Sequence, residues 1–164
     1  METRTIEISL DTAKRLYEQG GEYRDIALTA FKEHELIGDR LPKTWDEYCA
    51  KHGEEGDKIK ASLNTAYMTI NKYVFSDYKQ AQAHIAMMKL HLLRDEYRQG
   101  WLPCWGGGSY KYVIEWDMIK GMKELAIAQR TYDSDFLSFP TYGLADEFST
   151  IFSELIKQAG NLIS

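Results

Sequence analysis

This sequence of 164 residues has little cysteine, little proline and no surplus of positive charge. Its two cysteines, Cys49 and Cys104, belong to no Cys-x-x-Cys pair, so neither a thioredoxin-like redox site nor a cysteine zinc site is expected. The net charge of −5 argues against a protein that binds by neutralising phosphates. The chain also lacks a signal-peptide core and any apolar run of about 18 residues. We therefore expect a cytoplasmic protein without a membrane span.

Recognisable motifs of catalysis and of cofactor binding are lacking as well. The glycines at 106–108 follow an expected helix and precede an expected strand, whereas phosphate-binding loops place glycines between a strand and a helix. No nucleophile motif or activated cysteine is found. His84 and His91 lie two turns apart on one helix, while chelating pairs use a spacing of three or four residues. We expect no catalysis, no cofactor and no metal site, and a solvated face around the two histidines.

What the chain does have is enough apolar residues for a core, at 44% hydrophobic and 13% aromatic. Residues 1–53 have the pattern of a helical arm. Three short helices are expected in it: one capped by Ser9 or Asp11 and ended by Gly20–Gly21, one over residues 22–36, and one between Thr44 and Gly53. Thr44 and Glu47 have the spacing of a capping box. Because so short an arm buries little surface, we do not expect it to be an independent domain.

The second of these helices carries an apolar stripe that needs a partner. It consists of Tyr23, Ile26, Ala27, Ala30 and Phe31. We expect the stripe to dock on the second half of the chain or to bind another protein. A helix that reads DNA needs donors to base edges and a basic flank, whereas this helix carries Glu22 and Asp25. Nucleic-acid binding is therefore the alternative and is not favoured.

The rest of the chain predicts an α+β fold. Residues 54–76 are polar at first and then alternate, which predicts a linker with a possible strand. Residues 77–164 predict an α-β-β-β-α domain. Its long central helix is capped by Ser76 and runs to Arg98, and a three-stranded antiparallel meander follows. An amphipathic C-terminal helix begins near Tyr142.

The corner after the long helix is rich in aromatic residues. Trp101, Trp105 and Tyr110 form a possible interaction surface, since aromatic rings can stack on a ligand. The favoured interpretation is structural: Gly100 ends the helix, Pro103 prevents its resumption, and Trp101 and Trp105 cover the end of the core.

Several stretches form a recognisable set, among them "LPKTWDEYC", "QAQAHIAMMKLHLLRDEYRQGWLPCW" and "FLSFPTYGLADEFSTIFSELI". They resemble a large group of short uncharacterised proteins encoded in gut Bacteroidetes genomes, often in prophages and other mobile elements. The most specific part is Leu93-Arg94-Asp95 followed by Gly100, Trp101, Pro103 and Trp105. The resemblance implies a phage-type accessory protein and no mechanism.

The function expected from these observations is non-enzymatic and depends on contact with a protein partner or on self-association. Amphipathic helices, a high aromatic content and the lack of a catalytic constellation support this expectation. The alternative is a nucleic-acid-associated protein of a mobile element.

Overall fold

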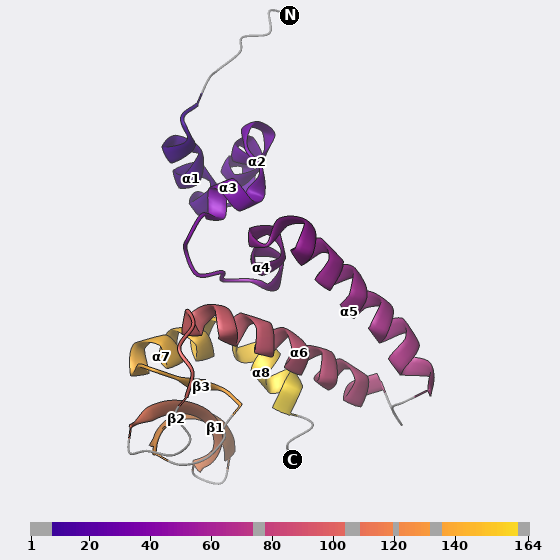
Figure 1. Cartoon of the computed structure of the whole chain (residues 1–164), viewed down its shortest axis with the longest axis vertical. Helices are drawn as coiled ribbons and strands as arrows, with labels where there is room; N and C mark the ends of the chain where they lie inside the picture. The colour runs from indigo at the N-terminus through magenta and orange to yellow at the C-terminus, as the bar shows by residue number, and fades with distance from the viewer. Residues whose placement is uncertain (1–7, 74–77, 104–108, 120–121, 132–135, 161–164) are drawn as a thin grey trace, which may run out of the picture. The chain divides into compact units, whose positions relative to one another are not determined.

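The computed structural model describes residues 8–73, 78–103, 109–119, 122–131 and 136–160 (Figure 1). The chain divides into two compact units, residues 1–61 and residues 62–164, with the boundary inside one long helix. Helices predominate over a three-stranded antiparallel sheet, so the predicted α+β class is confirmed. No helix within the described ranges is both long enough and apolar enough to span a membrane.

The N-terminal unit consists of short helices: α1 (Leu10–Gln19), α2 (Gly21–Ala30), α3 (Glu33–Ile37), α4 (Trp45–Lys51) and the first turns of α5 (Gly53–Tyr73). The hydroxyl group of Ser9 accepts the Thr12 N–H and begins α1, and Gly20, with a φ of +75°, ends it. The single helix expected over residues 22–36 is divided, because Phe31 is extended and separates α2 from α3.

The core of this unit is small. One cluster of buried residues comes from α1, α2 and α3: Ala13, Tyr17, Ala27, Leu36 and Ile37. Half-buried side chains surround them, namely Ile8, Leu16, Phe31 and Ala50. Pro42 and, in α4, Tyr48 and Cys49 are buried as well. With so few large apolar residues inside, the unit gains little from burial.

The expectation of a linker with a strand over residues 54–76 is wrong up to residue 73, where the chain is the helix α5; residues 74–76 lie outside the described residues. No proline interrupts this stretch, and the buried Leu63 lies one turn after the half-buried Ile59. α5 begins close against α4, since a Cβ on Gly56 would meet the carbonyl group of Cys49. Cys49 is a buried thiol.

The second unit contains the remainder of α5, then α6 (Tyr78–Arg98), the strands β1 (Lys111–Ile119), β2 (Met122–Arg130) and β3 (Ser138–Phe139), and finally α7 (Tyr142–Ile151) and α8 (Ser153–Gly160). α6 packs along α8, and α7 contacts all three strands. Figure 1 shows these helices beside the strongly twisted sheet.

The sheet is antiparallel as predicted, but it is not a meander in sequence order. β1 is central, and β3 pairs with β1 rather than with β2. The main contacts are the pairs Tyr112 with Phe139 and Val113 with Ser138. The short β3 therefore returns across the sheet to the side opposite β2.

An aromatic cluster joins the helices to the sheet in this unit. The ring of Phe148 lies 5.1 Å from Tyr97, 4.9 Å from Phe139 and 4.7 Å from Phe152, measured between centroids. Thr141 caps α7 by accepting the N–H of Leu144, and the helix begins at Tyr142, where the amphipathic pattern predicted its start. The C-terminal helix is expected as one element but is divided at Phe152, whose buried ring belongs to this cluster.

Candidate functional site

The structure describes two of the three aromatic residues predicted at the corner after α6, Trp101 and Tyr110. Gln99 and Gly100 have φ values of +49° and +83°, and the N–H of Trp101 donates to the carbonyl group of Arg98 at 2.9 Å. The helix thus ends at the predicted glycine. Trp101 is half-buried, and its ring lies 5.6 Å from the guanidinium carbon of Arg98, a cation–π contact. Trp105 lies outside the described residues.

Two other apolar side chains near this corner are open to solvent. Tyr110 is 63% exposed and Leu102 is 81% exposed. The rings of Trp101 and Tyr110 make no contact with each other in the described part of the corner. Trp101 is held by Arg98, and Tyr110 is an exposed ring. The interaction surface of Trp101, Trp105 and Tyr110 stays a prediction, because Trp105 is not among the described residues.

Two arginines of α6 hold β3 and the residues just before it, a role that sequence reasoning did not find. Arg98 donates from Nε to the carbonyl oxygen of Ser138 at 2.8 Å and from Nη2 to its hydroxyl oxygen at 2.6 Å. Arg94 donates from Nη1 to the carbonyl oxygen of Phe136 at 2.9 Å. Burial, together with the charge of Arg94, lowers the pKa of Arg98 to about 10, so it remains charged at neutral pH. In this chain the Leu-Arg-Asp stretch therefore serves folding.

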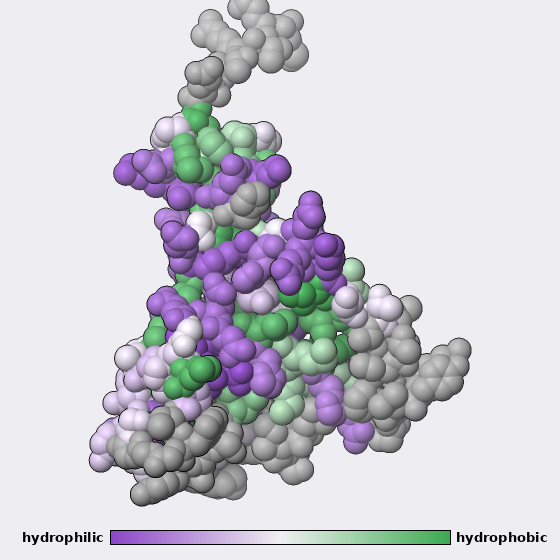
Figure 2. Space-filling model, in the orientation of Figure 1, coloured by the Kyte–Doolittle hydropathy of each residue, from purple (hydrophilic) through white to green (hydrophobic). Residues whose placement is uncertain are grey.

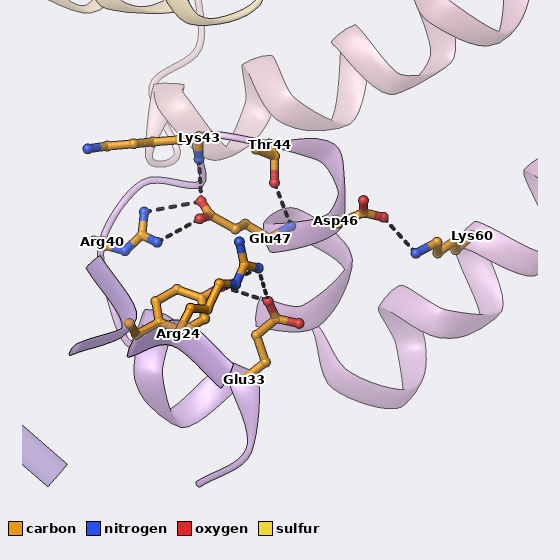
Figure 3. A network of polar contacts seen from close by, with 9 residues as sticks. Arg24, Glu33, Arg40, Lys43, Thr44, Asp46, Glu47 and Lys60 are labelled. Atoms are coloured by element: carbon orange, nitrogen blue, oxygen red, sulfur yellow. Dashed lines mark hydrogen bonds and ion pairs between the residues drawn. The ribbon is translucent and has the colours of Figure 1, made fainter. Parts of the chain in front are cut away.

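A polar cluster in the N-terminal unit also was not anticipated (Figure 3). The hydroxyl group of Tyr17 donates to Glu33 at 2.6 Å, and Arg24 donates to the oxygen atoms of both. The guanidinium group of Arg24 lies over the Tyr17 ring at 4.6 Å. Burial, and then the hydrogen bond to Glu33, raises the pKa of Tyr17 far above its ordinary value. The phenol is thus a neutral structural donor, and Arg24 is engaged inside the unit.

The predicted capping box at α4 forms only in part. Thr44 accepts the N–H of Glu47 at 3.0 Å, but the carboxylate of Glu47 accepts the N–H of Lys43 at 2.8 Å in place of that of Thr44. Both guanidinium nitrogens Nη1 and Nη2 of Arg40 also donate to this carboxylate, as Figure 3 shows. Burial alone raises the pKa of Glu47, but these hydrogen bonds outweigh it and hold the pKa below its ordinary value.

The two histidines of α6 are exposed, in line with the predicted solvated face. The His91 ring meets Phe136 edge-on at 4.4 Å. Partial burial, and then the charge of Arg94, lowers the pKa of His91. No group of three His, Cys, Asp or Glu residues among those described is arranged to hold a metal ion.

The predicted apolar stripe on α2 is divided between core and solvent. Ala27 is buried and Phe31 is half-buried, whereas Tyr23 is 55% and Ile26 is 50% exposed. We call Tyr23, Ile26 and the exposed Ala30 the α2 surface. Their spacing of three and four residues places them along one side of the helix. Figure 2 shows green, apolar surface over the part formed by α1 and α2, with purple residues beside it.

The N-terminal unit buries little of α2. Of its ten residues, all described, Ala27 alone is buried. A helix this short is unstable in water by itself and depends on packing. The α2 surface is therefore the strongest candidate for contact with another molecule.

No protein-family model, curated protein or solved structure matches the chain.

Proposed function

We propose that this protein is a non-catalytic, cytoplasmic accessory protein of a phage or other mobile element, and that it acts by binding another protein through the α2 surface. The genetic setting in this proposal comes from the resemblance in sequence alone. The exposed apolar residues of the N-terminal unit support the mode of action.

The exposure of Tyr23 and Ile26 is the observation that carries the proposal. Two large apolar side chains one turn apart gain free energy when a partner removes them from water, at about 25 cal/mol per Å² of apolar surface. Aromatic residues are also enriched at the centres of protein interfaces. A partner that covers this side of α2 would supply the packing that the small core of the unit does not.

The charges beside the α2 surface favour a protein over a nucleic acid. Glu22 and Asp25 are exposed on the same helix and would repel phosphates. Arg24, the cation of α2, is already bound to Glu33 and Tyr17. A protein partner with an apolar patch bordered by Lys or Arg fits this arrangement best.

Purification of the tagged full chain from cells that encode it tests the proposal. We expect a protein in fixed proportion to the chain, which Ile26→Asp removes because a charge would be buried in the interface. Leu102→Asp is the matched control, since it makes the same change at an exposed leucine in the other unit. Both variants should keep the thermal stability of the wild type, as exposed positions usually do.

Two outcomes would contradict the proposal. One is a co-purified protein that Ile26→Asp and Leu102→Asp release equally. The other is binding of the purified chain to DNA or RNA below micromolar concentration that weakens steeply with salt, which would support the nucleic-acid alternative.

A further inference from the structure

β2 forms one edge of the sheet, because the strand order is β2-β1-β3. It pairs with β1 in an unbroken antiparallel register, from Arg130 opposite Lys111 to Met122 opposite Ile119. In such a ladder alternate residues turn their N–H and C=O groups away from the neighbouring strand. The far side of β2 therefore presents unpaired backbone groups, and no strand in the described part of the chain covers it.

The hydrogen bonds of β1 show which residues of β2 face the open edge. The N–H of Ile114 donates to the carbonyl group of Leu137 at 2.9 Å, so Ile114 turns its backbone groups away from β2. Its partner in the ladder is Ile127. This pair is not hydrogen-bonded, and Ile127 directs its own N–H and C=O to the open edge. By the alternation of the strand, Leu125 and Gln129 do the same.

The opposite edge of the sheet is closed by side chains. The carbonyl groups of Phe136 and Ser138 accept hydrogen bonds from Arg94 and Arg98. Proteins commonly block edge strands with charged groups, which prevents unwanted pairing. β2 has the uncharged stretch 125–128 near its middle instead.

A groove of about 210 Å³ lies beside the open edge. It is lined by three residues of β2 and three of α7: Leu125, Ala126, Ile127, Tyr142, Asp146 and Ser149. The α7 residues are spaced by four and three positions and share one side of the helix. Tyr142 is exposed, and its ring meets that of Tyr112 edge-on at 6.0 Å. The groove thus has an apolar floor on the strand and a polar wall on the helix.

The geometry points to a peptide-binding site: the groove between β2 and α7 takes an extended segment of a partner protein by strand addition. Backbone groups of the peptide pair with those of Leu125 and Ile127, and every second side chain of the peptide faces α7. Asp146 is exposed and its carboxylate has no ion-pair partner among the described residues. The segment that fits therefore alternates apolar residues with Lys or Arg.

A second copy of this chain fits the edge less well than such a peptide. Two β2 strands paired antiparallel in one continuous sheet would bring the two α7 helices side by side on the same face. Asp146 and Glu147, both exposed, would then face the same residues of the other copy. Like charges at close range oppose this pairing.

Selection of displayed random nine-residue peptides on the full chain tests the site. We expect enriched peptides that alternate apolar and basic residues, and that bind at least fivefold more weakly to Asp146→Asn. Glu154→Gln makes the same change in charge at an exposed residue of α8 and should alter affinity less than twofold. Two peptides are then N-methylated, one at the odd-numbered amides and one at the even-numbered amides. Only one of these two sets faces β2, so one methylated peptide should lose binding and the other should keep it.

Three results would overturn the site: no enriched peptide, equal losses with Asp146→Asn and Glu154→Gln, or insensitivity to methylation in both registers. A dimer of the full chain that Gln129→Pro converts to a monomer would assign the edge to a second copy; proline is tolerated there because the N–H at that position faces outward. The site does not depend on the α2 surface, so Ile26→Asp should leave peptide affinity unchanged. The peptide-binding site and the proposed function can therefore fail independently of each other.

Discussion

Arg98 binds both oxygen atoms of Ser138, a residue forty positions further along the chain. Its Nε donates to the carbonyl oxygen at 2.8 Å and its Nη2 to the hydroxyl oxygen at 2.6 Å. Both residues are buried. Because β3 has two residues, it gains little from strand pairing, and the guanidinium group fixes its position against α6.

Replacement of Arg98 by Met should lower the free energy of unfolding by about 2–3 kcal/mol, since hydrogen bonds from a charged group are lost and Ser138 is left buried without them. Arg130→Met is the control. Its ion pair with Glu115 is more exposed and should contribute less than about 1 kcal/mol. Urea denaturation measures both values, and equal losses would show that the Arg98 contacts are not specific.

Gly160 lies against Trp116, and a Cβ there would come within 2.7 Å of the indole ring. Gly160→Ala should therefore destabilise the protein by about 1–3 kcal/mol, the range for overpacking a core. Gly143→Ala, in the first turn of α7, meets nothing within 4 Å and should stabilise by about 0.4–1 kcal/mol. Thermal melts of the two variants should move in opposite directions. A shared direction would contradict the close contact of α8 with β1.

Acid should weaken the N-terminal unit through Glu47. Its folded-state pKa lies below the ordinary value because Arg40 and the N–H of Lys43 bind the carboxylate. The corresponding stability is present above the unfolded-state pKa and is lost as pH falls through the folded-state pKa. Glu47→Gln should be less stable at neutral pH and less sensitive to acid. Unfolding at a series of pH values checks this, and an unchanged slope would count against the Arg40–Glu47 pair.

A fragment of residues 1–53 should not melt cooperatively as a monomer. It lacks the first turns of α5, which pack against α4 at Gly56, and its core has few large side chains. Circular dichroism with heating, together with a sedimentation measurement of mass, tests this. A sharp monomeric transition would show that the arm is an independent domain.

The sequence predicts those elements whose pattern is local. Ser9 begins α1 and Gly20 ends it, as predicted, because capping depends on neighbouring residues. The start of the C-terminal helix near Tyr142 is likewise predicted from its local apolar pattern. The alternation of Tyr112, Ile114 and Trp116 predicts β1, since a strand with one covered face has a period of two.

The parts that the sequence did not predict depend on contacts far along the chain. The short β3 pairs with β1 where Arg98 binds its outer carbonyl group at Ser138 and Arg94 binds that of Phe136 just before the strand, and no local pattern contains that information. The sequence predicts a linker with a strand where the chain forms α5, because Met68 and Ile70 alternate with Tyr67 and Thr69. This short pattern does not distinguish the period of a helix from that of a strand. The groove beside β2 likewise required the strand order.

Site-specific photocrosslinking at Tyr23 tests the central claim most directly. A photoreactive phenylalanine derivative replaces Tyr23 in the full chain, in cells that encode it, and a second chain carries the same group at Leu102, another exposed residue. The account predicts one discrete protein adduct at position 23 that Ile26→Asp removes, and none of that mass at position 102. Identical adducts at both positions, or an adduct at position 23 that nuclease destroys, would contradict the claim that α2 binds a protein partner.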